Sequence, residues 1–155
     1  MHQIIKLLQR INSWLQKPQP IVDLVLRLAV ANVFWKSGLN KIQSWDSTLM
    51  LFEYEYAVPV LAPAVAAYMA TAMELLLPVL LALGLGGRFA ALGLFGLNIV
   101  AVISYPDLSA SGREFHVLWG LLLAVTVTRG AGSIAFDAII ERVWKNRQSQ
   151  LTGKI

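Results

Sequence analysis

The chain has 155 residues, of which 57% are hydrophobic and 14% charged, and its formal net charge is +4. A soluble domain carries about 25% charged residues, so this composition indicates an integral membrane protein. The basic residues cluster at the chain ends and between apolar runs, where they would meet lipid headgroups, and we expect no nucleic-acid partner. The absence of cysteine excludes disulfides, thiolate metal sites and iron–sulfur clusters held by this chain.

Residues 1–17 are predicted to form an amphipathic helix at the membrane interface. Apolar residues recur at helical spacing from Ile4 to Leu15, with polar residues mostly on the opposite face. Pro18 and Pro20 then end the helix and turn the chain into the membrane. Because no small-residue cleavage site follows, the segment is not read as a signal peptide.

Four apolar stretches between residues 18 and 132 are predicted to cross the membrane, since about 20 helical residues span a hydrocarbon core. They cover residues 21–41, 64–84, 89–105 and 115–129. The connection between the first two is too apolar for a solvated loop, and we expect a short helix there, from Thr48 to about Glu55, lying over the bundle. The predicted fold is therefore all-α, an integral membrane four-helix bundle with amphipathic interfacial helices at both termini.

Residues 133–155 form the last predicted unit. Gly130 and Gly132 end the fourth span, and an amphipathic helix is predicted from Ser133 onward. We expect the residues after Asn146 to be a disordered tail. The chain thus divides into an N-terminal helix at 1–17, a four-span domain at 18–132 and this C-terminal unit.

The charge distribution predicts the orientation of the spans. An even number of spans puts both termini on one side, and most basic residues then share that side. They are Lys6, Arg10, Lys17, Arg88, Arg129, Arg142, Lys145, Arg147 and Lys154, against Lys41 and Arg113 on the other side. Because basic residues favour the cytoplasmic face, both termini are predicted to be cytoplasmic.

Glu74 lies near the middle of the second span, where a carboxylate is costly and should face a partner. At about 1.5 Å per residue from the inner edge, Arg27 lies roughly 9 Å deep, Glu74 roughly 15 Å and Lys36 roughly 22 Å. We therefore predict a buried Arg27–Glu74 pair, with Lys36 nearby and Asn98 adding hydrogen bonds. Such a group either locks two helices together or leaves one positive charge to bind an anionic head or a quinone carbonyl.

The outer half of the bundle contains candidate ligands for one metal ion. Met69, Met73 and His116 could supply two thioethers and an imidazole to Cu(I), although methionines also fill gaps between helices. No other metal site is predicted. Haem is not expected, because His2 and His116 are placed on opposite sides of the membrane and cannot ligate one iron.

Several short motifs occur in order along the chain. They are Arg27, Phe34, Gly38 and Lys41; then Glu74, Leu83-Gly84, Arg88 and Ala90-Ala91; then Gly130-Ala131-Gly132-Ser133 and Asp137. In this order and spacing they resemble the DoxX family of small bacterial four-helix membrane proteins, over roughly residues 20–140. The resemblance implies a structural role for Gly38, Lys41, Arg88, Gly130, Gly132 and Asp137. It also implies a bacterial inner-membrane protein.

The family resemblance suggests two functions. The first is a membrane subunit or accessory of a redox or metal-stress system, which binds a protein partner or small ligand around the predicted Arg27–Glu74 pair. The alternative is a quinone-binding subunit of a membrane oxidoreductase. Quinone is the one cofactor that the resemblance suggests, no catalytic residue is assigned, and self-association is a further expectation beside the lipid bilayer and a protein partner.

Overall fold

The structure is a computed structural model that describes the backbone of residues 2–152 and the side chains of residues 3–149. Within this part the chain forms seven helices and no strand, so the all-α prediction is confirmed. The helices are α1 (His2–Gln16), α2 (Gln19–Gln43), α3 (Trp45–Tyr54), α4 (Pro63–Leu83), α5 (Gly87–Ser104), α6 (Ala110–Arg129) and α7 (Phe136–Thr152).

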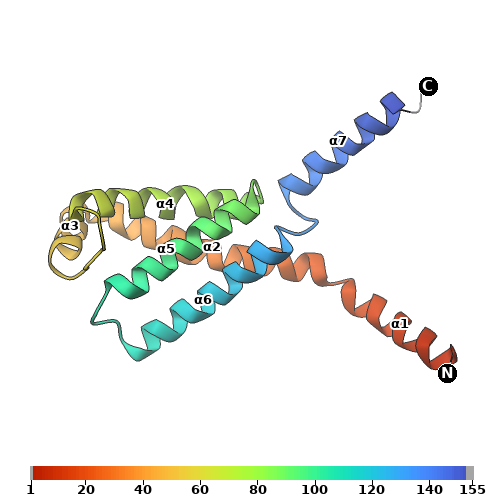
Figure 1. Ribbon diagram of the computed structural model, residues 1–155, viewed down its shortest axis with the longest axis horizontal. Helices are drawn as coiled ribbons and strands as arrows, with labels where there is room; N and C mark the ends of the chain where they lie inside the picture. The colour runs from red at the N-terminus through yellow and green to blue at the C-terminus, as the bar shows by residue number, and fades with distance from the viewer. Residues whose placement is uncertain (1, 153–155) are drawn as a thin grey trace.

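Four of these helices, α2, α4, α5 and α6, form a bundle (Figure 1). α2 packs on α4, α4 on α5 and α5 on α6, and α6 returns to α2. The bundle core consists of aliphatic, alanine and phenylalanine side chains, and its outer faces expose large apolar residues of the kind that lipid covers. The buried core residues are Val30, Ala31, Phe34, Leu81, Ala90, Ala91, Leu94 and Leu123.

Two helices of the described chain, α4 and α5, are long and apolar enough to cross a membrane. α2 carries Asp23, Arg27, Lys36 and Lys41 along its length, and α6 begins in a polar segment. These two helices lie beside α4 and α5 and occupy the ranges predicted as the first and fourth spans. That α2 and α6 also cross the membrane stays a prediction.

The short helix expected over the bundle is present as α3, which begins three residues earlier than predicted. It packs on α4 and α2 at the end of the bundle farthest from the termini (Figure 1). Phe52 is buried there against Ala66 and Ala67 at the start of α4. α3 and the loop that follows it thus close this end of the bundle.

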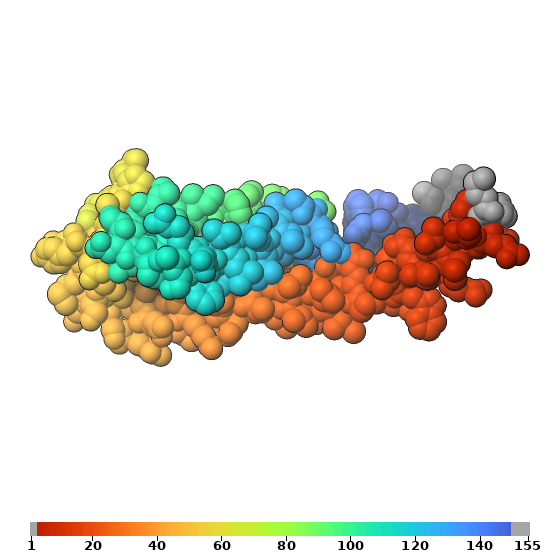
Figure 2. Space-filling view, turned by 90° about the horizontal axis from the view of Figure 1, so that it is seen from below, coloured from red at the N-terminus to blue at the C-terminus, as the bar shows by residue number. Residues whose placement is uncertain are grey.

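The terminal helices α1 and α7 extend away from the other end of the bundle, as Figures 1 and 2 show. Both expose their apolar residues, among them Trp14 on α1 and Trp144 on α7. The prediction of a disordered tail after Asn146 is wrong, because α7 continues to Thr152. An i,i+4 ion pair between Lys145 and Glu141, 2.6 Å long, supports the helix near that point. Residues 153–155, which include Lys154, lie outside the described residues.

Close approach of α2 and α4 depends on Gly38. A Cβ at this position would lie 2.9 Å from the Leu75 Cδ2 atom and 3.1 Å from the Glu74 carbonyl carbon. These distances are shorter than ordinary carbon contacts, so any larger residue would push the helices apart. Gly38 therefore brings the backbone of α2 next to the turn of α4 that carries Glu74.

Candidate functional site: an ion pair in an aromatic cavity

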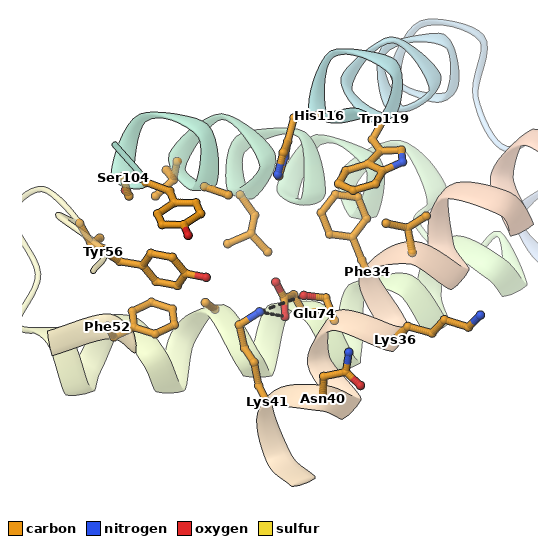
Figure 3. A pocket seen from close by; sticks show the side chains of 18 residues that line it. Phe34, Lys36, Asn40, Lys41, Phe52, Tyr56, Glu74, Ser104, His116 and Trp119 are labelled. Carbon is orange, nitrogen blue, oxygen red and sulfur yellow. Dashed lines mark hydrogen bonds and ion pairs between the residues drawn. The ribbon is translucent and has the colours of Figure 1, made fainter. Parts of the chain in front are cut away.

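A cavity, named the main cavity because it lies among the bundle helices, is enclosed by α2, α4, α5 and α6 in the half nearer α3 (Figure 3), and a more voluminous pocket lies at the inner end near Arg129 and Asp137. The volume of the main cavity is about 400 Å³, within the range of about 300–1,000 Å³ that small-molecule sites occupy. Charged and polar side chains enter it between aromatic walls. The polar and charged lining residues are Lys36, Ser37, Asn40, Lys41, Glu74, Ser104 and His116. The aromatic ones are Phe34, Phe52, Tyr56, Tyr105 and Trp119.

Glu74 pairs with Lys41 at the wall of this cavity. The Lys41 Nζ atom lies 2.6 Å from Glu74 Oε2 and also donates to Ser37 Oγ at 2.9 Å. Glu74 is 8% exposed, and the Lys41 side chain is 18% exposed. The expectation that the acid in the apolar span has a basic partner is met, but the predicted partner, Arg27, is wrong.

The register between α2 and α4 explains the error. Gly38 faces Glu74, whereas a Cβ at Gly84 would lie 2.9 Å from Arg27 Nη1. Arg27 is therefore about ten residues along α4 from Glu74, roughly 15 Å away. The depths predicted from the sequence are counted from the inner edge of each apolar run. This count sets the start of the first run level with the end of the second run. α2 instead begins farther toward the inner end, which moves Arg27 away and brings Lys41 opposite the acid.

Arg27 has a different role at the inner end of the bundle. It is 2% exposed, and its guanidinium donates hydrogen bonds to the carbonyl oxygens of Ala131 and Ile134, the second at 2.9 Å. These carbonyls belong to the connection between α6 and α7, which has no regular hydrogen bonding of its own. Arg27 thus fixes that connection against the bundle.

The other two residues of the predicted constellation also lie away from Glu74. Lys36 is exposed, and its ammonium group extends away from the Lys41–Glu74 pair (Figure 3). Asn98, which is 4% exposed, bonds to His116: its Nδ2 donates to the backbone oxygen of His116 at 2.9 Å, and its Oδ1 lies 2.8 Å from His116 Nδ1. The prediction that Asn98 bonds to the ion pair is therefore wrong, and Asn98 holds His116 instead.

His116 enters the cavity from α6, across from the Lys41–Glu74 pair (Figure 3). Its ring packs edge-on to Trp119, with centroids 4.9 Å apart, and Trp119 in turn contacts Phe34 and Phe115. The imidazole is thus held at one edge by Asn98 and on one side by an aromatic ring. Its remaining nitrogen, Nε2, makes no hydrogen bond within the described residues.

A third wall is built by Tyr56, which follows α3, and Tyr105, which follows α5. Their rings meet edge-to-face at 5.2 Å, and Tyr56 also packs on Phe52 at 4.9 Å. Burial raises the pKa of Tyr56 above its ordinary value, so the phenol stays protonated and can donate a hydrogen bond. A backbone hydrogen bond of 2.7 Å from the Ala57 nitrogen to the Ser104 oxygen ties this loop to α5.

Four residues of the predicted structural motif, Arg88, Gly130, Gly132 and Asp137, lie at the inner end, whereas Gly38 and Lys41 lie beside Glu74. Asp137 accepts hydrogen bonds from the Gly86 and Gly87 nitrogens at 2.9 and 3.0 Å, so it caps the N-terminus of α5. Arg88 lies against Gly130, and Gly132 lies against Asp23. These four residues therefore join α2, α5, α6 and α7 around the connection that Arg27 also holds.

The three candidate copper ligands are not gathered in the main cavity. His116 lines it, but Met69 and Met73 do not, and Met69 is exposed on α4. A copper site stays a prediction without a common pocket to support it. The side chain of His2, which the haem argument used, lies outside the described residues.

Ser37, Tyr56, Ser104 and Trp119 are among the cavity-lining residues that sequence reasoning did not assign to a site. Ser37 lies one turn before Lys41 and could have been found from that i,i+4 spacing. The other three come from α6, from the end of α5 and from the loop after α3. No periodicity connects these segments, so only tertiary packing could bring them together.

The chain is similar in sequence to known proteins. The DoxX family model matches residues 22–106. An uncharacterized protein of Haemophilus influenzae is 30% identical over 133 residues, which cover 80% of this chain and 86% of that protein. No solved structure matches the chain.

Proposed function

Because the chain belongs to the DoxX family of membrane proteins, we propose that it is a membrane subunit or accessory of a redox or metal-stress system and binds a small amphipathic molecule in its main cavity. The observation that carries this proposal is the Lys41–Glu74 pair exposed to an aromatic-walled space of about 400 Å³. In this space the pair can still bond to a bound molecule, because Lys41 keeps a free donor and Glu74 keeps lone pairs.

The chemistry of the lining defines the ligand. Phe34, Trp119 and Tyr56 offer flat apolar surfaces to a ring, while the ion pair and His116 offer hydrogen bonds from facing walls (Figure 3). A small ring with polar substituents satisfies both kinds of surface. An inorganic anion would leave the aromatic walls without contacts, and a bare hydrocarbon would leave the polar groups unpaired.

The facing polar walls also favour a second candidate, a quinone-binding subunit of a membrane oxidoreductase. A ring with oxygens at opposite ends could direct one oxygen toward His116 and the other toward Lys41, which lie on facing sides of the cavity. This candidate differs from the first in requiring electron transfer to or from the bound ring. A copurified quinone with its ultraviolet band would favour it, whereas a stable complex with a protein and no cofactor would favour the first.

The orientation of the protein is part of the proposal. With both termini in the bacterial cytoplasm, the cavity lies in the outer half of the inner membrane, close to the side on which α3 lies. The ligand would then be shared with a partner on that side, and the exposed apolar faces of α1 and α7 would remain for the inner membrane surface, a protein partner or a second copy.

Native mass spectrometry of gently extracted protein tests the proposal. Ala101→Phe places a large ring in the cavity, whereas Ala72→Leu adds similar apolar bulk on the exposed face of α4 and serves as the control. We expect a bound small molecule in the wild type and in Ala72→Leu, and its loss in Ala101→Phe. The proposal fails if the wild type carries no small molecule. It also fails if Ala101→Phe retains the molecule while its thermal melting profile shows that it is folded.

A further inference from the structure

The hydrogen bonds around His116 determine which of its nitrogens faces the cavity as an acceptor. A backbone carbonyl can only accept, so the Asn98 atom that faces the His116 carbonyl oxygen must be the amide nitrogen. The amide oxygen then faces His116 Nδ1 at 2.8 Å, and since that oxygen also only accepts, Nδ1 must carry the hydrogen. In the neutral ring, Nε2 is left with a lone pair and no hydrogen.

The facing wall can both donate and accept. Lys41 Nζ uses one hydrogen on Glu74 and one on Ser37, which leaves a third donor, and the Glu74 carboxylate has lone pairs besides the one that Lys41 occupies. One hydroxyl group on a ligand could therefore accept from Lys41 and donate to Glu74. The His116 wall, by contrast, can only accept.

Ser104 gives an independent sign that a polar group belongs in the cavity. Its side chain is buried, with a residue exposure of 3%, it lines the cavity, and its Oγ atom has no hydrogen-bond partner within the described residues. A buried hydroxyl without a partner is destabilising, so the site is incomplete as the chain alone forms it.

We propose that the cavity selects a ring that carries hydroxyl groups, a phenol or hydroquinone, and disfavours the corresponding quinone. One hydroxyl donates to His116 Nε2, and a second, across the ring, bonds to the Lys41–Glu74 pair. A quinone carbonyl presents only lone pairs, so it would meet the lone pair of Nε2 without a hydrogen bond. This inference rests on the proposed function, because it names the ligand class of the same cavity.

Three matched probes test the preference: tetramethylhydroquinone kept reduced with dithionite, its dimethyl ether, and tetramethylbenzoquinone. Their affinities are measured by calorimetry for the full chain in lipid nanodiscs, at mildly alkaline pH where imidazole is neutral. We expect the hydroquinone to bind roughly tenfold more tightly than the other two, the effect of leaving one buried hydrogen-bonding group unpaired. In His116→Leu the three affinities should converge to within about twofold.

Nitrogen NMR of histidine-labelled protein tests the tautomer without any ligand. The wild type should show His116 with a protonated Nδ1 and a bare Nε2, and His116→Leu identifies the resonance by its loss. The inference is overturned if Nε2 carries the hydrogen, or if the quinone or the ether binds as tightly as the hydroquinone. If none of the probes binds while native mass spectrometry still finds a bound molecule, the ligand class is wrong and the proposed function stands; if neither method finds a ligand, both fail.

Discussion

Lys41 and Glu74 show how an ionisable residue is tolerated in an apolar helix. Glu74 is paired with Lys41, and Lys41 is held by both Glu74 and Ser37, so neither charge is left without a partner. Removing one member leaves the other buried and unpaired, which costs more than replacing both. Comparing the stability of a variant that lacks one member with that of a variant that lacks both therefore measures the contribution of the pair.

Lys41→Met is expected to destabilise the protein by about 3–5 kcal/mol, because it leaves Glu74 without a partner. Lys41→Met combined with Glu74→Leu should recover most of that loss. Thermal unfolding in detergent, followed by size-exclusion fluorescence, measures both. Lys36→Met on the same helix is the control and should change little, since Lys36 is exposed. A double variant as unstable as the single one would contradict this account.

Arg27 is a second buried charge, but its partners are backbone carbonyls. Lysine has a single nitrogen and cannot span the carbonyls of Ala131 and Ile134 in the geometry of a guanidinium. We expect Arg27→Lys to cost about 1.5–3 kcal/mol, the range for a hydrogen bond to a charged group, and to expose the α6–α7 connection to protease. Limited proteolysis measures this, with the exposed Arg113→Lys as the control. Equal cleavage of both variants would show that Arg27 does not hold the connection.

At the scale of elements, the packing of α2 against α4 sets the register that brings Lys41 to Glu74. Gly38→Ala would place its Cβ within 2.9 Å of a Leu75 methyl and about as near to the backbone of α4, so we expect a loss of about 1–3 kcal/mol. Gly96→Ala on α5 is the matched control: nothing lies within 4 Å of its Cβ, and alanine favours the helix by up to about 1 kcal/mol. Melting temperatures of the two variants should move in opposite directions.

The cap on α5 couples the terminal helix to the bundle. Asp137, at the start of α7, accepts from two nitrogens of α5 through its two oxygens. Asp137→Asn keeps only one accepting oxygen and loses the negative charge at the helix N-terminus, so a loss of about 1 kcal/mol is expected. Hydrogen exchange of the Gly86 and Gly87 amides should accelerate in this variant. Unchanged exchange would mean that the cap is dispensable.

For the whole molecule, the first and last described helices leave the bundle at the same end (Figure 1). The chain has no cysteine, so single cysteines can report the side of the membrane without background. Ser13→Cys on α1 should react with an impermeant maleimide only after the cells are opened, whereas Ser111→Cys at the far end of the bundle should react in intact spheroplasts. The reverse labelling would invert the proposed topology and place the cavity in the inner half of the membrane.

The sequence by itself determined the helical class, the positions of the bundle helices and the need of Glu74 for a basic partner, because apolar run length and the cost of a buried charge are local properties. Tertiary structure decided that Lys41, rather than Arg27, pairs with Glu74. A shift in register between α2 and α4 changes which residues face each other without changing the length of either apolar run. The cavity depends most on tertiary structure: His116, Ser104, Tyr56 and Lys41 come from separate segments, and only packing brings their side chains around one space.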